Sequence, residues 1–212
     1  MAKQGKGARD KGSAFERKTA KTLGAWWGHD FHRTPGSGSL HWGSSNNVAG
    51  DIVTPPEADF PYVIECKDHN DDWTLESVVL NKADVKNWWA QVVNDSLSVK
   101  KTPMLVFKRN RSSVFIMLPY IEKLANKLES MHAPFMISYV EFKDLQERPN
   151  RFKVIVFTQD YLTMFTQSFF RTLYSEEASW LTHSRMSDNY EITDTIKEKD
   201  YETNIDSILN KL

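Results

Sequence analysis

The sequence has one cysteine, Cys66, which excludes an internal disulfide and any site built from several thiolates. No apolar run approaches the ~18 residues that span a bilayer, and the basic N-terminus lacks the apolar stretch of a signal peptide. From these absences we expect a cytoplasmic protein of a reducing compartment with no membrane partner.

The chain also has little net charge, −1 over 212 residues, which argues against a protein that coats nucleic acid. Its charge is nevertheless uneven. Residues 1–21 carry seven Lys or Arg and two acidic residues, a net charge of +5, whereas residues 171–212 carry five and nine, a net charge of −4. A basic N-terminus would attract a phosphate backbone, but a solvated tail explains this segment equally well when it is taken alone.

Length and a 40% hydrophobic composition predict one mixed α/β domain over residues 1–174, with a basic arm at 1–11. Residues 175–212 would form an acidic tail, flexible or helical, that either keeps the protein soluble or binds a protein partner. The predicted elements, in order, are a helix from Ser13, strands near 48–54 and 61–67, a helix at 78–99, strands at 102–109 and 112–118, a helix opened by Pro119, strands at 135–142 and 151–157, and a helix at 158–174.

The stretch GDIVTPPEADFPYVIECK, residues 50–67, carries the strongest chemical signal. In a strand, Glu65 and Lys67 share one face and Cys66 lies on the other. If the two strands form a hairpin that is symmetric about Ala58, Asp51 lies opposite Glu65. Two carboxylates this close repel each other unless a cation lies between them, and Mg²⁺ suits such oxygen ligands.

Lys67 would complement this metal, because an ammonium beside the bound water can help to orient and deprotonate it and can contact a phosphate. The pattern therefore predicts metal-assisted phosphodiester hydrolysis. The spacing of these residues is loose, and an ordinary charged hairpin with a surface ion pair is the alternative. What favours the site is that the charged residues end apolar, strand-like runs, where burial is costly unless the charges are used.

The motifs KGSAFERKTAKTLGAWWG, FHRTPGSGS, GDIV and YVIECK follow one another between Lys11 and Leu118. In this order they resemble the core of the PD-(D/E)xK nucleases, most closely the archaeal-type Holliday junction resolvases and their phage relatives. The resemblance implies a restriction-endonuclease-like mixed central sheet flanked by helices, in a protein encoded by a prokaryote or phage. It also implies a homodimer that cuts opposing strands of branched DNA by paired nicks, leaving 5′-phosphates.

The resemblance implies specific site residues as well. The catalytic set would be Glu16, Asp51, Glu65, Lys67 and Gln91. Mg²⁺, for which Mn²⁺ could substitute, would be held by Asp51, Glu65, Glu16 and the backbone carbonyl of Cys66. The residues expected to contact DNA are Lys11, Arg17, Arg33, Ser37, Ser39 and His69. Gly50 stands where the family usually has proline, a change that we expect to be harmless.

Simpler interpretations exist for several of these residues. Glu16 fits the N3 position of a capping box that begins at Ser13, and Gln91 alone would be a solvated side chain. Trp88 and Trp89 could stack on bases, but their helical spacing favours the core. Two other functions also stay open: a sequence-reading restriction-type or nicking nuclease of the same fold, and a DNA-binding accessory protein without turnover.

Overall fold

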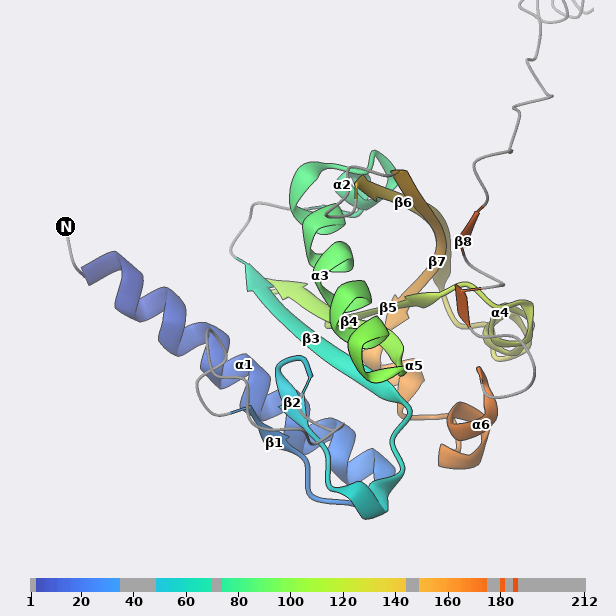
Figure 1. Ribbon diagram of the computed structural model, residues 1–212, viewed down its shortest axis with the longest axis horizontal. Helices are drawn as coiled ribbons and strands as arrows, with labels where there is room; N and C mark the ends of the chain where they lie inside the picture. Colours follow the sequence, from blue (N-terminus) through green and yellow to red (C-terminus); the bar gives the residue numbers. More distant parts are fainter. Residues whose placement is uncertain are drawn as a thin grey trace, which may run out of the picture.

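A mixed β-sheet forms the centre of the protein (Figure 1). The computed structural model describes residues 3–34, 49–69, 74–143, 149–174, 180–181 and 185–186. The strand order is β3 (Tyr62–His69), β4 (Thr102–Arg109), β5 (Phe115–Pro119), β7 (Pro149–Thr158) and β6 (Phe135–Lys143), and β8 (Arg185–Met186) pairs with β7. Only the β3–β4 pair of this sheet is parallel. The predicted restriction-endonuclease-like α/β arrangement is confirmed.

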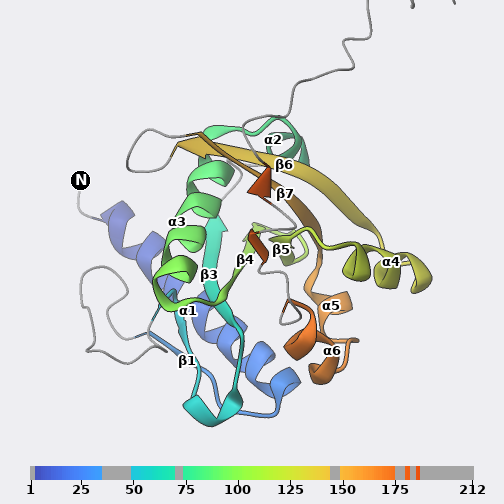
Figure 2. The same ribbon diagram turned by 45° about the vertical axis from the view of Figure 1, so that its right-hand side comes forward.

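Helices cover both faces of the sheet (Figures 1 and 2). One face packs on α1 (Lys3–Trp27), α4 (Glu122–Ser130), α5 (Gln159–Leu162) and α6 (Gln167–Thr172), and the other on α2 (Leu75–Val79) and α3 (Ala83–Val99). The pleat of β3 divides its side chains accordingly, because Ile64 packs on the α1 side and Val63 on the α3 side. Trp88 and Trp89 are buried in the α3 layer, which confirms their assignment to the core.

Helix α1 begins at Lys3, well before the predicted start at Ser13, so the capping box of Ser13 and Glu16 is wrong. No proline lies between residues 3 and 12, so the helix continues through them in spite of three glycines, and Glu16 lies within it. The second half of α1 buries Phe15, Leu23 and Trp27 on one face. The first half projects beyond the sheet (Figure 1).

Three other predicted helices differ from the observed ones. The predicted helix at 78–99 is divided into α2 and α3 by Asn81, whose φ is 50° and whose side chain bonds to the backbone of Glu141 in β6. Pro119 ends β5 instead of opening a helix, and α4 starts at Glu122. The predicted helix at 158–174 breaks between α5 and α6, which leaves the Phe165 carbonyl able to accept a hydrogen bond from the Trp26 indole.

The predicted antiparallel hairpin is also wrong. Strand β2 (Ile52–Val53) pairs with β1 (His32–Arg33), and the chain then passes through a short 3₁₀ helix, Pro56–Ala58, to β3. Gly50 and Ile64 instead form a parallel bridge. A parallel register advances both chains together, so the next residues, Asp51 and Glu65, still lie side by side.

Within the described residues, no helix is long and apolar enough to cross a membrane. Part of the predicted acidic tail lies on the sheet, because Trp180 is buried in the α3 layer and donates a hydrogen bond to the Lys101 carbonyl. Residues 187–212 lie outside the described residues, as do Ser37 and Ser39.

Candidate active site

Asp51 is fixed against the outer edge of β3 by its backbone and by its carboxylate. Its N–H donates to the Ile64 carbonyl at 2.8 Å, and its Oδ2 accepts from the Cys66 N–H at 2.8 Å. Its own carbonyl is turned away and accepts from the Thr34 N–H. The carboxylate thus takes the place that a backbone carbonyl would have in a parallel ladder, which sets its position beside Glu65.

This approach to β3 depends on Gly50. Its φ is +78°, and a Cβ there would lie 2.4 Å from the Ile64 carbonyl oxygen and 2.9 Å from a Val63 methyl. Proline, with φ fixed near −65°, could not adopt this conformation. The backbone at this position therefore requires glycine, and the expectation that glycine in place of proline is harmless to metal binding stays a prediction.

Gly50→Ala is expected to lower the free energy of unfolding by about 2 kcal/mol or more and to reduce nuclease activity, since Asp51 would be displaced. Gly7→Ala is the matched control. Gly7 lies in α1 with no atom within 4 Å of an added Cβ, so alanine should be neutral or stabilising there. Urea denaturation measures both changes, and equal stability of the two variants would contradict the requirement at Gly50.

Glu65, Lys67 and Gln91 form a connected group on the α3 side of β3. The pleat places Glu65 and Lys67 on one face, and their side chains form an ion pair with a 2.6 Å separation between Nζ and Oε1. The same ammonium donates to Gln91 Oε1 of α3 at 3.0 Å. Glu65 is 2% exposed, whereas the Lys67 side chain is 20% exposed, so the ammonium lies between a buried carboxylate and solvent.

Burial makes both carboxylates unfavourable as anions. It raises the pKa of Glu65 to about 8, with a further contribution from the charge of Asp51, and nearby Lys67 offsets only part of this rise. The pKa of Asp51 is raised as well, mainly by burial and also by Glu16, although the Cys66 N–H opposes the increase. A cation between the two carboxylates would relieve both costs.

The donors present fit Mg²⁺. Within the described ranges no three Asp, Glu, His or Cys side chains form a complete metal site. However, Mg²⁺ commonly takes one or two carboxylates and completes its shell with water and substrate phosphate. The Cys66 carbonyl can join Asp51 and Glu65, because the Cys66 N–H already faces Asp51 and the two backbone groups of one strand residue point to the same edge.

The structure brings Glu16 and Arg33 together, since Arg33 Nε donates to Glu16 Oε2. The predicted metal ligand and the predicted DNA contact are therefore bound to each other. Among the other residues expected to contact DNA, Lys11 pairs with Asp68 at 3.1 Å, His69 packs on Trp88 with ring centroids 4.6 Å apart, and Arg17 is exposed on α1.

Asp95 was not singled out from the sequence. Burial raises its pKa, which Lys67 opposes, and its charge contributes to the raised pKa of Glu65. It follows Gln91 by four residues on α3, so the two side chains lie on one face of the helix. That spacing is the signal that could have placed a second acidic residue beside Lys67.

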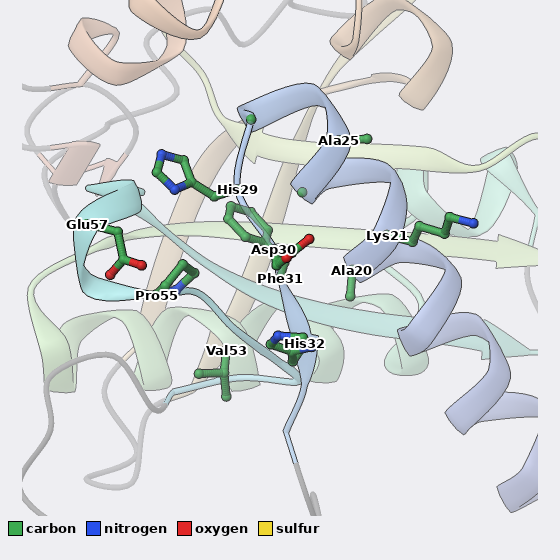
Figure 3. Close-up of a pocket in the computed structure, with 12 residues that line it drawn as sticks. Ala20, Lys21, Ala25, His29, Asp30, Phe31, His32, Val53, Pro55 and Glu57 are labelled. Atoms are coloured by element: carbon green, nitrogen blue, oxygen red, sulfur yellow. The ribbon is translucent and has the colours of Figure 1, made fainter.

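An open cavity of about 830 Å³ lies between the second half of α1 and the β1–β2 ribbon, and none of the candidate site residues described above lines it. Figure 3 shows His32 and Val53 at one end of it and His29 and Glu57 at the other. His32 lines the cavity, whereas the next residue, Arg33, reaches Glu16. Successive strand residues point to opposite faces, so the cavity and the Arg33–Glu16 pair lie on opposite sides of β1.

The chain matches the family described as "Phage putative PDDEXK endonuclease" over residues 7–172, a span that includes the whole cluster. It is also similar to Protein D14 of Escherichia phage T5, with 29% identity over 127 residues, which is 58% of this chain and 78% of that protein. No solved structure matches it. Since the match extends over more than half of the chain, the protein belongs to this phage family of PD-(D/E)xK endonucleases.

Proposed function

We propose that the protein is a Mg²⁺-dependent, structure-selective endodeoxyribonuclease that resolves four-way DNA junctions. The observation that carries the proposal is the cluster of Asp51, Glu65 and Lys67 at the outer edge of β3, with both carboxylates buried and the ammonium partly exposed. Such an arrangement suits hydrolysis of a phosphodiester, whose transition state gains negative charge.

Asp51, Glu65 and the Cys66 carbonyl would hold Mg²⁺, or Mn²⁺ in its place, which lowers the pKa of a bound water and stabilises charge on the phosphate. Glu16 would complete this set. In the described structure its carboxylate accepts from Arg33. A DNA phosphate that takes up the Arg33 guanidinium releases Glu16 toward the site, so substrate binding and completion of the site are linked.

Lys67 would act on the attacking water and on the scissile phosphate. The Lys67 ammonium is held from two elements: Glu65 contacts it from β3, and Gln91 Oε1, on α3, accepts a hydrogen bond from it. With Glu65 used as a metal ligand, the Gln91 contact would still hold the Lys67 ammonium in place. The partly exposed ammonium can then donate one hydrogen bond to a phosphate oxygen and another to the attacking water.

The junction substrate and the homodimer are inferred from the resemblance to the resolvases. In a homodimer two sites would cut opposing strands of a branched DNA symmetrically and leave 5′-phosphates. Phosphate contacts from α1 and from Arg33 would hold the strands beside the cut, since backbone contacts position DNA without reading its sequence.

The test compares a labelled four-way junction with a linear duplex of matching arms, in Mg²⁺ and in EDTA. We expect paired nicks in the junction alone, dependent on Mg²⁺ and reduced about 10³-fold or more in Lys67→Ala, the loss typical of removing a group that acts in the transition state. Cutting of the linear duplex at a fixed sequence would favour a restriction-type or nicking nuclease. Binding without cutting of either DNA would favour the accessory protein.

A further inference from the structure

The end of β4 and the turn that follows it, residues 108–113, carry a basic group that has no part in the cluster of Asp51, Glu65 and Lys67. The sequence of this segment is KRNRSS, and we refer to it as the basic turn. Lys108 and Arg109 end β4, Arg111 lies in the turn, and Lys11 of α1 reaches this segment through a 2.8 Å hydrogen bond from its Nζ to Asn110 Oδ1. One carboxylate, Asp68, pairs with two of these four cationic side chains.

Asp68 fixes the base of this group. It is 3% exposed and pairs with Lys11 at 3.1 Å and with Lys108 at 3.2 Å. Lys108 also lies over the Phe15 ring, 5.4 Å from its centroid. The two lysines therefore join α1, β3 and β4 around one buried carboxylate, and the group keeps a net charge of +3.

The two arginines have no comparable structural role. Both are exposed, and neither guanidinium forms an ion pair with a carboxylate of the described residues. The backbone between them is nevertheless held rigidly, because the Ser112 hydroxyl accepts from the Arg109 N–H at 3.0 Å and also lies within hydrogen-bond distance of the Arg109 carbonyl. The turn thus presents two guanidinium groups on an ordered backbone.

Arg111 occupies an unfavourable backbone position. Its φ is +57°, in the left-handed region that glycine and asparagine adopt at much lower cost than arginine. Strain at an exposed residue is consistent with selection for the side chain that it presents.

The basic turn lies at the same end of the sheet as the catalytic lysine. In the β3–β4 register Lys67 pairs with Phe107 and His69 with Arg109, so Arg109 lies two residues, or about 7 Å, beyond Lys67 along the sheet. The contact between Lys11 and Asn110 also places the turn against the part of α1 that projects beyond the sheet (Figure 1). A DNA strand at the catalytic cluster would pass it within about two to four phosphates of the cut.

We propose that the basic turn is a DNA-backbone clamp, in which Arg109 and Arg111 bind phosphates that flank the scissile bond while Asp68, Lys11 and Lys108 hold the turn in place. Guanidinium groups bind phosphate oxygens through two parallel hydrogen bonds, which suits exposed arginines on a rigid turn. The clamp rests on the proposed function, because it assumes that the substrate is DNA. It contacts only phosphates, however, so it does not require that the DNA be a four-way junction.

The test uses the variant Arg109→Ala/Arg111→Gly and the matched control Lys123→Ala/Lys127→Ala, which removes two cations from α4, away from the projecting part of α1 (Figure 1). Binding of a labelled junction and of a linear duplex is measured in EDTA over a series of salt concentrations. The turn variant should bind about tenfold more weakly at ~0.1 M salt, and its slope of log affinity against log salt should be smaller by about 2.

Three further readouts separate the clamp from a purely structural role. Glycine relieves the strain at position 111, so the thermal midpoint of the turn variant should be unchanged or higher. Its KM should rise while its kcat is kept, because the arginines touch no reacting atom. The control variant should keep the affinity and salt slope of the unaltered protein.

Unchanged affinity and salt slope in the turn variant, or an equal loss in the control, would overturn the clamp, as would a complete absence of DNA binding by the unaltered protein. Failure of the proposed function gives a different result. If the unaltered protein binds DNA but does not prefer or cut the junction, the junction assignment fails, whereas the salt slopes on either DNA still decide the role of the turn.

Discussion

Asp51→Asn is expected to lower metal-dependent DNA cleavage by about a thousandfold while junction binding in EDTA stays within about twofold of the unaltered protein. Asparagine retains an oxygen that can accept from the Cys66 N–H, the 2.8 Å contact that fixes this side chain to β3. The backbone bonds to Ile64 and Thr34 do not involve the side chain. The substitution therefore removes the negative charge needed for the cation and keeps the shape of the site.

Asp59→Asn provides the control for this charge removal. Asp59 is exposed, pairs with Arg171 at 2.7 Å and has a φ of 45°, a conformation that asparagine tolerates well. Cleavage by this variant should equal that of the unaltered protein, because a surface ion pair contributes little to stability. If Asp51→Asn cut DNA as fast as Asp59→Asn, Asp51 would not be a metal ligand and the site would have to be sought elsewhere.

The proximity of Asp51 and Glu65 was predictable from the sequence, but the geometry that produces it was not. The prediction paired the two residues across an antiparallel hairpin centred on Ala58. In the structure they are adjacent because Gly50 and Ile64 form a parallel bridge. Both registers place the same two carboxylates together, so the pattern of apolar residues ending in Glu-x-Lys predicted this pair regardless of strand direction.

What the sequence did not reveal depends on contacts between distant segments. The need for glycine at position 50 comes from its close approach to the Ile64 carbonyl, and the bond between Glu16 and Arg33 joins α1 to β1. Likewise, the break between α5 and α6 coincides with a hydrogen bond from Trp26, more than a hundred residues away in the chain. Local propensity does not encode such contacts, and tertiary structure overrides it where they form.

Glu65→Gln is expected to abolish cleavage and at the same time to stabilise the metal-free protein at alkaline pH. The pKa of Glu65 rises from 4.5 to about 8, mainly through burial. Below pH 4.5 the side chain is neutral in both the folded and the unfolded protein, so it has no effect on the pH dependence. Between pH 4.5 and about 8 the unfolded chain releases this proton and the folded protein retains it, so stability falls as pH rises across this range.

Glutamine resembles the neutral acid at every pH, so the variant should not lose stability as the pH rises from 4.5 to about 8. At pH 8.5 in EDTA the variant should be more stable to urea than the unaltered protein by on the order of 2–4 kcal/mol, and the difference should vanish near pH 4.5. Glu57→Gln, at an exposed position in the 3₁₀ helix, is the control, and its free energy of unfolding should equal that of the unaltered protein within about 0.5 kcal/mol, as is usual for a surface substitution. A Glu65→Gln variant that is less stable than the unaltered protein at pH 8.5 would contradict the raised pKa.

Mg²⁺ should reverse the order of stability of the unaltered protein and the Glu65→Gln variant. A cation that binds the folded state alone stabilises it in proportion to the logarithm of its concentration above the dissociation constant. Ionised Glu65 is a ligand and glutamine is a much poorer one, so added Mg²⁺ should raise the thermal midpoint of the unaltered protein at pH 8.5 and leave that of Glu65→Gln almost unchanged. A buried pair of carboxylates that destabilises the metal-free fold is thus the same feature that gives the site its affinity for a cation, which is why one substitution should increase stability and remove activity.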